Sequence, residues 1–333
     1  MVVTIKDVAR AVNVSVTTVS RVLNNKPDVS EETKKKVKEA IRTLGYNPNN
    51  IARGLVLRKT NTIGLIIPDI NNPFFPEIVK GIERKAKEEG YSLILYNTDN
   101  NKEEEKEALA LLRSKKVDGI ILSFSLENKE ILKKLEKEEY PVVQIDRQIR
   151  DSLYPAVTID NKRSAYNATE YLIKQGHKEI GHITGDLSTE TALERLKGFK
   201  MALEKYGIPL REEWILEGDY SRGSGKELME RIIKLKHRPT AIFFANDLMA
   251  FGAYETIYNY NYRIPEDFSI IGHDNIEITS FVKPGLTTMD QPKYQLGAIA
   301  VEKLINLIEK KNDFHSVILE NELIIRDSVK AIR

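Results

Sequence analysis

The chain has 333 residues, more than one compact domain of common size, so two or three structural units are expected. With 41% hydrophobic and 30% charged residues it has a globular composition, and no apolar run approaches the roughly 18 residues of a membrane span. No signal peptide is recognisable at the N-terminus, so we expect a cytoplasmic protein. The absence of Cys excludes disulfides, thiolate zinc sites and a Cys nucleophile.

Charge is distributed unevenly along the chain. The first sixty residues carry 12 Lys and Arg against 5 Asp and Glu, a net charge of +7, whereas the remaining residues have a net charge of −5. A small basic segment on a mildly acidic body is expected when only that segment contacts polyanionic phosphate. A solvated Lys-rich surface would produce the same charge, so charge alone does not decide between the two.

Two short helices joined by a tight turn are predicted at the N-terminus. The apolar side chains of residues 5–12 lie on one helical face after Thr4, a favourable N-cap, and Asn13 interrupts this periodicity. Ser15 is the next N-cap candidate, and residues 16–23 again place their Val and Leu side chains at helical spacing.

A third helix is expected between Ser30, where it begins, and Gly45, its C-cap candidate. Glu31 and Glu32 in its first turn favour the positive end of the helix dipole. Three helices of this size form a minimal helix-turn-helix domain. Its second helix can enter the major groove and place short polar side chains and an Arg against base edges.

Three stretches of this head carry a specific motif, TIKDVA at 4–9, VSVTTVSRVLN at 14–24 and LGYNPN at 44–49. Together they resemble the head of the LacI/GalR family of bacterial transcription regulators. The resemblance implies that the residues matching Val16, Thr17 and Arg21 read bases, while Thr18, Ser20 and Asn24 lie near phosphates. Val16 is apolar, so a thymine methyl group is its expected partner.

Residues 48–60 resemble the hinge helix of the same family. The resemblance implies a helix that forms only on operator DNA, pairs with its dimer mate in the minor groove and kinks the duplex with Leu55. Intrinsic propensity supports conditional folding, because so short a helix is marginal and Gly54 costs about 1 kcal/mol relative to Ala. An ordinary linker is the alternative. The DNA-binding residues expected from head and hinge are Thr4, Ser15, Val16, Thr17, Thr18, Ser20, Arg21, Asn24, Asn49, Ala52, Arg53 and Leu55.

From Thr62 onward, short apolar runs alternate with amphipathic helices, which is typical of βαβ units. Two doubly wound subdomains of similar size are implied, and ligands of such sheets bind beyond the carboxyl ends of the strands. Strands are expected at 63–67, 93–96, 119–122, 142–145, 180–183 and 241–244, and helices at 75–89, 103–114, 129–137, 164–175, 190–206 and after Asn246.

Polar or aromatic residues follow several of these strands. They are residues 69–75, Asp146 with Arg147, Asn246 with Asp247, and His273 with Asp274, which follows 270–272. Each taken alone could be a helix cap, since Asp and Asn are common there. Their recurrence at strand ends favours a ligand site.

The body as a whole resembles the periplasmic sugar-binding-protein fold that serves as the sensor of the LacI/GalR family. Its NPFF at 72–75 and IDRQ at 145–148 are similar to ribose-binding proteins and ribose repressors. The resemblance implies a monosaccharide effector such as ribose, and the chemistry suits a polyol because carboxylates, guanidiniums, amides and aromatic rings are all present. The effector-binding residues implied are Asp69, Asn72, Phe74, Phe75, Asp146, Arg147, Arg195, Tyr220, Asn246, Asp274 and Gln291.

The sequence contains no convincing motif of an enzyme. Residues 223–226 (GSGK) resemble a phosphate loop only superficially, because Glu227 stands where Ser or Thr should follow Lys226, and a turn at a helix start is the simpler interpretation. The five His residues show no metal-ligand spacing. We therefore expect no catalytic residue, no metal and no cofactor. A solute-binding protein without a DNA role would share the body but not the head. For what is sensed, the alternatives are a phosphorylated carrier protein, as in a catabolite-control-type regulator, a purine or a larger sugar.

The expected organisation is an all-α helix-turn-helix domain over 1–47, a hinge helix or linker over 48–60 and an effector-binding domain over 61–333. Within that domain one subdomain would comprise about 61–160 plus 291–320, and the other about 161–290 plus 321–333. The protein would act as a homodimer on a pseudo-palindromic double-stranded operator, and repression with release by a sugar is the behaviour that the resemblance favours.

Overall fold

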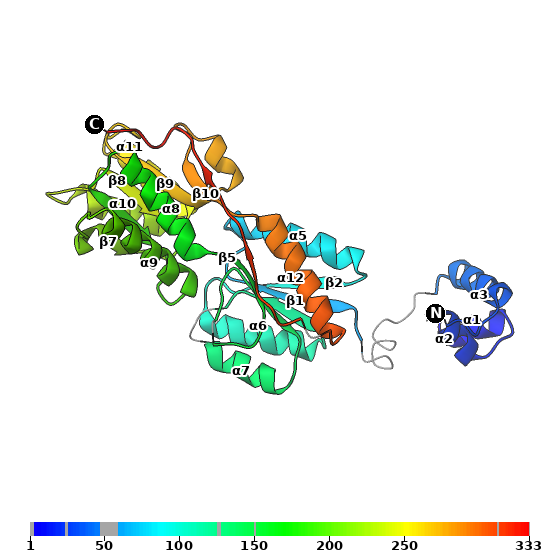
Figure 1. Cartoon of the computed structure of the whole chain (residues 1–333). Coiled ribbons are helices and arrows are strands. Elements are labelled where there is room, and N and C mark those ends of the chain that lie inside the picture. The colour runs from blue at the N-terminus through cyan, green and yellow to red at the C-terminus, as the bar shows by residue number, and fades with distance from the viewer. Residues whose placement is uncertain are drawn as a thin grey trace. The chain divides into compact units, whose positions relative to one another are not determined.

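The computed structural model describes residues 3–23, 26–46, 59–124, 128–149, 151–311 and 313–332, which fall into two compact units, residues 1–60 and 61–333 (Figure 1). Asn24 and the four predicted hinge residues lie outside the described residues. The assignments made for Asn24, Asn49, Ala52, Arg53 and Leu55 therefore stay predictions.

The described residues of the first unit form three helices, α1 (Ile5–Ala11), α2 (Val16–Leu23) and α3 (Glu31–Leu44). Each start has a local cause. The Asp7 carboxylate accepts from the backbone N–H of Thr4 at 2.9 Å, and the Ser15 hydroxyl accepts from the backbone N–H of Thr18 at 3.0 Å. Gly45 has a φ of +63° and closes α3.

The small core of this unit comes from the apolar face of each helix. Val8, Val19 and Val37, one from each helix, are fully buried against one another. The turn between α1 and α2 contains Asn13 with a φ of +51°, a left-handed conformation that Asn adopts more readily than most residues. The predicted three-helix head is confirmed.

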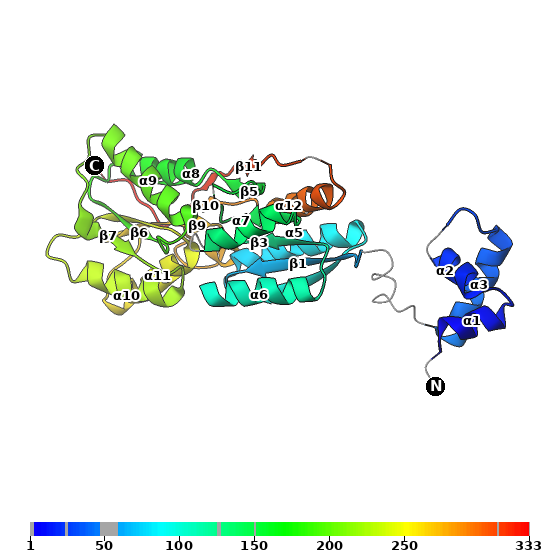
Figure 2. The ribbon, with the colours of Figure 1, turned by 90° about the horizontal axis from the view of Figure 1, so that it is seen from below.

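The second unit contains two six-stranded sheets, each with helices on both faces, which we call lobe 1 and lobe 2 (Figures 1 and 2). Lobe 1 has strand order β11-β5-β4-β3-β1-β2, and lobe 2 has β12-β10-β9-β8-β6-β7. The strands of lobe 1 are β1 (Thr62–Ile67), β2 (Ser92–Asn97), β3 (Gly119–Leu122), β4 (Val142–Ile145), β5 (Ala156–Ile159) and β11 (Val317–Leu319). Those of lobe 2 are β6 (Ile180–Thr184), β7 (Ile215–Glu217), β8 (Ala241–Phe244), β9 (Ser269–Asp274), β10 (Thr287–Asp290) and β12 (Leu323–Ile324).

Lobe 1 buries its sheet on both sides. Ile63, Leu65 and Ile67 pack with α5 (Phe74–Glu88) and α12 (Lys293–Ile308), whereas Ile66 between them packs with α6 (Lys102–Ser114) and α7 (Lys129–Lys137). Side chains of a strand alternate between faces, so a strand covered on both faces is apolar throughout. This explains why the sequence of β1 is a nearly continuous apolar run.

Lobe 2 is built in the same way. Its helices α10 (Arg222–Ile233) and α11 (Asp247–Asn259) pack on one face, and α8 (Asn161–Lys174) and α9 (Glu190–Lys205) on the other. The strand pairs are parallel except that β12 runs antiparallel to β10. The predicted fold, a helical head followed by two doubly wound α/β subdomains, is thus confirmed.

The chain passes between the two lobes where β5 leads into α8, where β10 leads into α12, and between β11 and β12. In both lobes the first strand lies next to the edge strand, between the second and third strands of that lobe. That reversal of strand order creates a crevice at the carboxyl ends of the central strands. Residues that follow β1, β4, β8 and β9 are therefore positioned to line a common site.

Several elements differ from the expected series. Strands β5, β7, β10, β11 and β12 and helix α12 were not among the predicted elements, and α8 begins three residues earlier than expected, with the Asp160 side chain accepting from the backbone N–H of Arg163. Residues 223–226 do lie at the start of a helix, because the Ser221 hydroxyl accepts from the backbone N–H of Ser224 and caps α10. Among the described residues, no helix is both long and apolar enough to cross a membrane.

Candidate functional site

The outward face of α2 presents the side chains predicted to read DNA. Val16, Thr17 and Arg21 are exposed, and Ser15 at the helix start is exposed as well. Val16 keeps 39% of its surface accessible although it is apolar. Val8, Val19, Val22, Val29 and Val37 of the head are buried, so the exposure of Val16 is consistent with a side chain reserved for contact with another molecule.

Arg21 has an ionic partner within the head. Its Nη1 lies 3.1 Å from Oδ2 of Asp28, and both side chains remain more than half exposed. An exposed pair of this kind contributes about 0–1 kcal/mol, so it does not prevent the guanidinium from turning to a base edge. Thr18 and Ser20, the predicted phosphate neighbours, are half-buried, and Thr4 is exposed at the start of α1.

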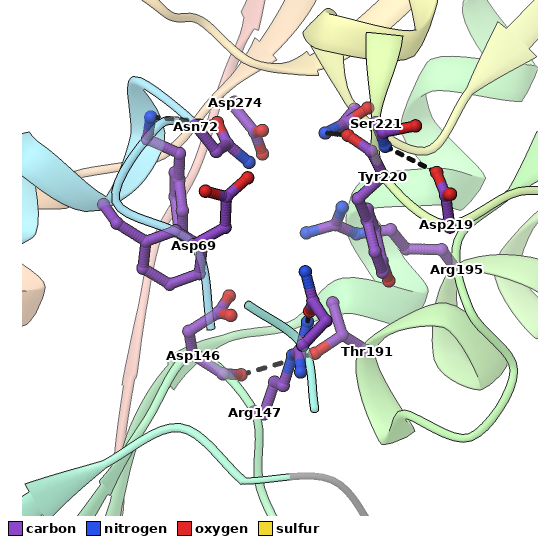
Figure 3. Close-up of a pocket in the computed structure, with 14 residues that line it drawn as sticks. Asp69, Asn72, Asp146, Arg147, Thr191, Arg195, Asp219, Tyr220, Ser221 and Asp274 are labelled. Carbon is purple, nitrogen blue, oxygen red and sulfur yellow. Dashed lines mark hydrogen bonds between the residues drawn. The ribbon is translucent and has the colours of Figure 1, made fainter. Parts of the chain in front are cut away.

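A cavity between the two lobes collects most of the residues predicted to bind an effector (Figure 3). It encloses about 530 Å³ of empty space, part of it open to solvent. Ten of the eleven predicted side chains line it, and only Gln291 does not. The lining residues are Asp69, Asn72, Phe74, Phe75, Asn100, Asp146, Arg147, Thr191, Arg195, Asp219, Tyr220, Ser221, Asn246 and Asp274.

Three of the lining residues have left-handed backbones. Asp146 has a φ of +60°, Tyr220 of +69° and Asp274 of +115°. Such conformations cost non-glycine residues about 1–3 kcal/mol each and collect at functional sites. Each of the three follows a strand by one to three residues or ends it, so the strained turn directs the side chain into the cavity instead of continuing along the sheet.

Aromatic side chains form two parts of the wall. Phe74 and Phe75 begin α5, and their rings meet edge to face at 5.0 Å between centroids. From lobe 2, Tyr220 lies with its ring 6.0 Å from the Arg147 guanidinium carbon. The ring rests on Gly185, where an added Cβ would come within 1.9 Å of it, so only Gly leaves it room.

Both guanidiniums of the cavity are fixed by protein contacts. Arg147 donates to Oδ1 of Asn100 at 2.7 Å. Arg195 is 2% exposed, and it donates through Nε to Oδ1 of Asn161 at 2.9 Å and through Nη1 to the Ala245 carbonyl oxygen. Guanidiniums that are held in place in this way are preorganised donors for hydroxyl or carboxylate oxygens.

Asn246 serves as a helix cap as well as a cavity residue. Its Oδ1 accepts from the backbone N–H of Met249 at 3.0 Å, and its Nδ2 donates to the Tyr220 carbonyl oxygen at 2.9 Å. Asp69 and Asn72 likewise accept from nearby backbone N–H groups at 2.8 and 3.1 Å. The cap interpretation and the cavity interpretation therefore both hold for Asn246, whereas Asp69 and Asn72 make contacts in the loop that leads into α5, whose start has no side-chain cap.

Gln291 lies behind the cavity wall. Its Nε2 donates to Oδ1 of Asp274 at 2.7 Å. Gln291 thereby orients the Asp274 carboxylate, which does line the cavity. The Gln291 amide, which was predicted to bind the effector directly, is occupied by this contact.

The carboxylates of Asp69, Asp146 and Asp274 lie on one side of the cavity and Arg195 and Tyr220 on the other (Figure 3). Burial raises the pKa of Asp146 to about 6, and burial raises the pKa of Asp274 to about 6. The Arg195 guanidinium acts in the opposite direction on both carboxyl groups. Both remain mostly ionised above pH 7, where they are strong acceptors for hydroxyl groups.

Four lining residues were missed from the sequence, Asn100, Thr191, Asp219 and Ser221. Asn100 follows β2 by three residues, so the strand-end rule could have found it. Thr191 precedes Arg195 by one helical turn, and the other two flank Tyr220. Within the part of the chain that the structure describes, no group of three or more His, Asp or Glu residues could hold a metal ion.

Comparison with known proteins identifies the family of the head and of the body. Residues 4–49 match the family described as bacterial regulatory proteins, lacI family, and residues 60–326 match periplasmic binding proteins and sugar binding domain of LacI family. The chain is 40% identical over 332 residues to catabolite control protein A of Priestia megaterium, covering 99% of this chain and 100% of that protein. It is 40% identical over 329 residues to the transcriptional repressor PurR of Aliivibrio salmonicida, covering 98% of each.

Solved structures give the same result. A lac repressor dimer bound to operator and an anti-inducer has a TM-score of 0.90 at 28% identity, covering 99% of this chain and 100% of that one. A LacI family regulator from Enterococcus faecium with bound ribose has a TM-score of 0.74 at 32% identity, covering 82% and 100%. The relatives of this chain are transcriptional regulators and not enzymes. Because the chain has a lacI family head, a solute-binding protein without a DNA role is excluded. The chain belongs to the LacI family of DNA-binding transcriptional regulators, with an effector-binding domain behind its helix-turn-helix head.

Proposed function

We propose that this protein is a repressor that a monosaccharide, with ribose as the first candidate, releases from its operator. The composition of the cavity carries the proposal. Charged acceptors, fixed cationic donors and aromatic faces surround one small space, which is the arrangement that recognises a polyol by hydrogen bonds and ring stacking. The relative from Enterococcus faecium with bound ribose supports the choice of a pentose.

The charge balance of the cavity favours a sugar without phosphate. Four carboxylates line it, Asp69, Asp146, Asp219 and Asp274, against the two guanidiniums of Arg147 and Arg195. A phosphate dianion would face this excess of negative charge in a partly buried space, where repulsion is weakly screened. Neutral sugars lack that cost. We therefore expect ribose to bind at least ten times more tightly than ribose 5-phosphate.

DNA recognition is assigned to the head and hinge. Val16, Thr17 and Arg21 on α2 read bases, and residues 48–60 form the hinge, with Leu55 in the minor groove of a pseudo-palindromic operator. The protein acts as a homodimer. In support, the lac repressor structure is a dimer on operator, and lobe 2 exposes Ile278 at 47% and Phe281 at 69%, an apolar surface that a partner copy would cover.

The alternative is a catabolite-control-type regulator that responds to a phosphorylated carrier protein, and the likeness to catabolite control protein A favours it. The test compares ligands directly. Thermal shift and calorimetry are run with D-ribose, other pentoses, hexoses and ribose 5-phosphate, since a ligand of the folded state raises its apparent stability. An operator is then selected from random duplex DNA, and its release by the binding sugar is followed by fluorescence anisotropy.

Binding of a free sugar together with release of the operator is the expected result. A sugar that binds but tightens the operator complex would make it a corepressor and overturn the release mechanism. If no sugar binds while a phosphorylated carrier protein changes operator affinity, the sugar-sensing function is wrong.

A further inference from the structure

A lysine is buried where the chain passes from lobe 2 to lobe 1. Lys293 is the first residue of α12, and it is 5% exposed. Burial disfavours an ammonium group, and the dipole at a helix N-terminus disfavours a cation as well. An apolar side chain would avoid both the burial of a charge and its repulsion by the helix dipole. The contacts that the ammonium makes therefore indicate its role.

The ammonium is held by backbone carbonyl oxygens. Lys293 Nζ donates to the carbonyl of Asp274 at 2.7 Å, of Asn275 at 3.1 Å and of Gln291 at 3.2 Å. A lysine ammonium has three N–H donors, and three carbonyls accept here. Asp274 lines the effector cavity, Asn275 follows it in the same turn, and Gln291 lies behind the cavity wall with its amide bonded to Asp274.

The turn that Lys293 binds is one of the strained parts of that wall. Asp274 has a φ of +115°, which is unfavourable for a residue with a side chain, and Asn275 follows with a left-handed φ of +51°. The Asp274 carbonyl oxygen meets Lys293, while its carboxylate lines the cavity. The same residue thus presents one end to the ammonium and the other to the ligand space.

Lobe 2 supplies further contacts to this turn, and Lys293 adds two hydrogen bonds from the crossing. The Asp247 carboxylate accepts from the backbone N–H of Ile276 at 3.0 Å and from the Thr288 hydroxyl at 2.6 Å. These bonds fix the end of the turn inside lobe 2. They leave the Asp274 and Asn275 carbonyls to the ammonium.

Two carboxylates complete the surroundings of the ammonium. Oδ1 of Asp290 lies 3.6 Å away at the end of β10 in lobe 2, and Oε2 of Glu77 lies 3.9 Å away on α5 of lobe 1. Lys293 is therefore placed between carboxylates of both lobes at the segment that joins them. A change in lobe arrangement at this crossing would move the ammonium relative to one lobe or the other.

We propose that Lys293 is a positioning residue of the effector site, whose ammonium holds the Asp274–Asn275 turn from behind so that the Asp274 carboxylate faces the ligand. Because it sits at the lobe crossing beside Glu77, the same ammonium ties the ligand-facing turn of lobe 2 to lobe 1. This inference rests on the proposed sugar-binding function of the cavity.

The first test measures D-ribose affinity by calorimetry. Lys293→Met removes the ammonium and keeps an unbranched side chain that is one atom shorter, so we expect about 10- to 100-fold weaker binding, the loss typical of a charged hydrogen bond. Lys303→Met is the matched control, because Lys303 lies on the same helix and is paired with Asp313, away from the cavity. It should bind ribose within twofold of the parent protein.

A double-mutant cycle separates positioning from a general structural effect. If Lys293 acts through Asp274, then Asp274→Asn combined with Lys293→Met should bind ribose no more than about twofold more weakly than Asp274→Asn alone. A full additional loss in the double variant would overturn the proposal. Should Lys293→Met not fold, Lys293→Gln keeps a neutral N–H donor, and it should bind about 3- to 30-fold more weakly. Parent-like affinity in either single variant would also overturn the proposal.

A ligand-free measurement keeps the inference independent of ribose. Hydrogen exchange followed by mass spectrometry should show at least tenfold faster exchange at residues 275–279 in Lys293→Met, with no change in Lys303→Met. Unchanged protection would show that Lys293 does not hold the turn. Failure of ribose to bind the parent protein would contradict the sugar proposal alone, and hydrogen exchange would still decide the role of Lys293.

Discussion

Replacing Asp274 by Asn should raise the stability of the ligand-free protein and lower its affinity for the effector. Asp274 is 4% exposed and lies on the cavity wall. Burial raises its pKa from 3.8 to about 6, and a tenfold change in a protonation equilibrium corresponds to about 1.4 kcal/mol. The ionised carboxylate therefore destabilises the ligand-free fold by up to about 3 kcal/mol at pH 8.

Asn removes that charge at nearly the same volume, and its Oδ1 can still accept from Gln291 Nε2. We expect a gain of about 1–3 kcal/mol in the free energy of unfolding, and domains of this size shift in Tm by roughly 2–4 °C per kcal/mol. The effector loses an ionised acceptor, which is worth about 1.5–3 kcal/mol, so its affinity should fall about 10- to 150-fold.

The assay is differential scanning calorimetry at pH 8 without ligand, together with titration of D-ribose. Asp151→Asn is the control, because Asp151 is exposed and outside the cavity, and it should change neither quantity. A lower Tm for Asp274→Asn, or an unchanged affinity for a sugar that the parent protein binds, would refute the reasoning that a buried charge is kept there for the ligand.

Three further results are expected. The Tm gain of Asp274→Asn should disappear by about pH 4. Because the carboxyl pKa is raised in the folded state, the ionised carboxylate destabilises the fold fully only above about pH 6, and not at all below the pKa of the unfolded chain. A gain that persists at pH 4 in the same scans would have another cause. Gly225→Ala should lower the free energy of unfolding in urea by more than about 2 kcal/mol, because its Cβ would come within 2.1 Å of the Met249 carbonyl oxygen. Gly223→Ala, whose Cβ would meet nothing nearer than 3.6 Å, should be neutral or stabilising. Equal effects of the two variants would contradict the packing between α10 and α11. Leu55→Ala should weaken binding to a selected operator and reduce DNA bending in a circular-permutation assay, and unchanged affinity and bend would remove the hinge assignment.

Local patterns carried the prediction of the head and most of the body. In α2, helical spacing of valines after a Ser cap involves residues within one or two turns, so it can be read directly from the chain. The strands β1, β3, β4 and β8 are buried on both faces and appear as apolar runs. Strand β5 was not predicted, because its sequence AVTI contains a Thr and a small Ala and forms a weaker apolar run than β3 or β8.

The candidate site was predictable in its members but not in their roles. The rule that ligands bind beyond strand ends, together with the family resemblance, selected ten residues that line one cavity. It could not show that Gln291 turns its amide to Asp274, because those residues are 17 positions apart and meet only when β9 and β10 pair.

Sequence by itself determined that a basic helix-turn-helix head precedes a two-lobed α/β body, because helix periodicity, capping and strand runs are encoded within a few neighbouring residues. Tertiary structure alone decided which side chains face one another across the lobes. The left-handed turn at Asp274 and the buried ammonium of Lys293 behind it depend on contacts between segments that follow different strands. Such contacts are set by the pairing and crossing of the sheets, which no local pattern specifies.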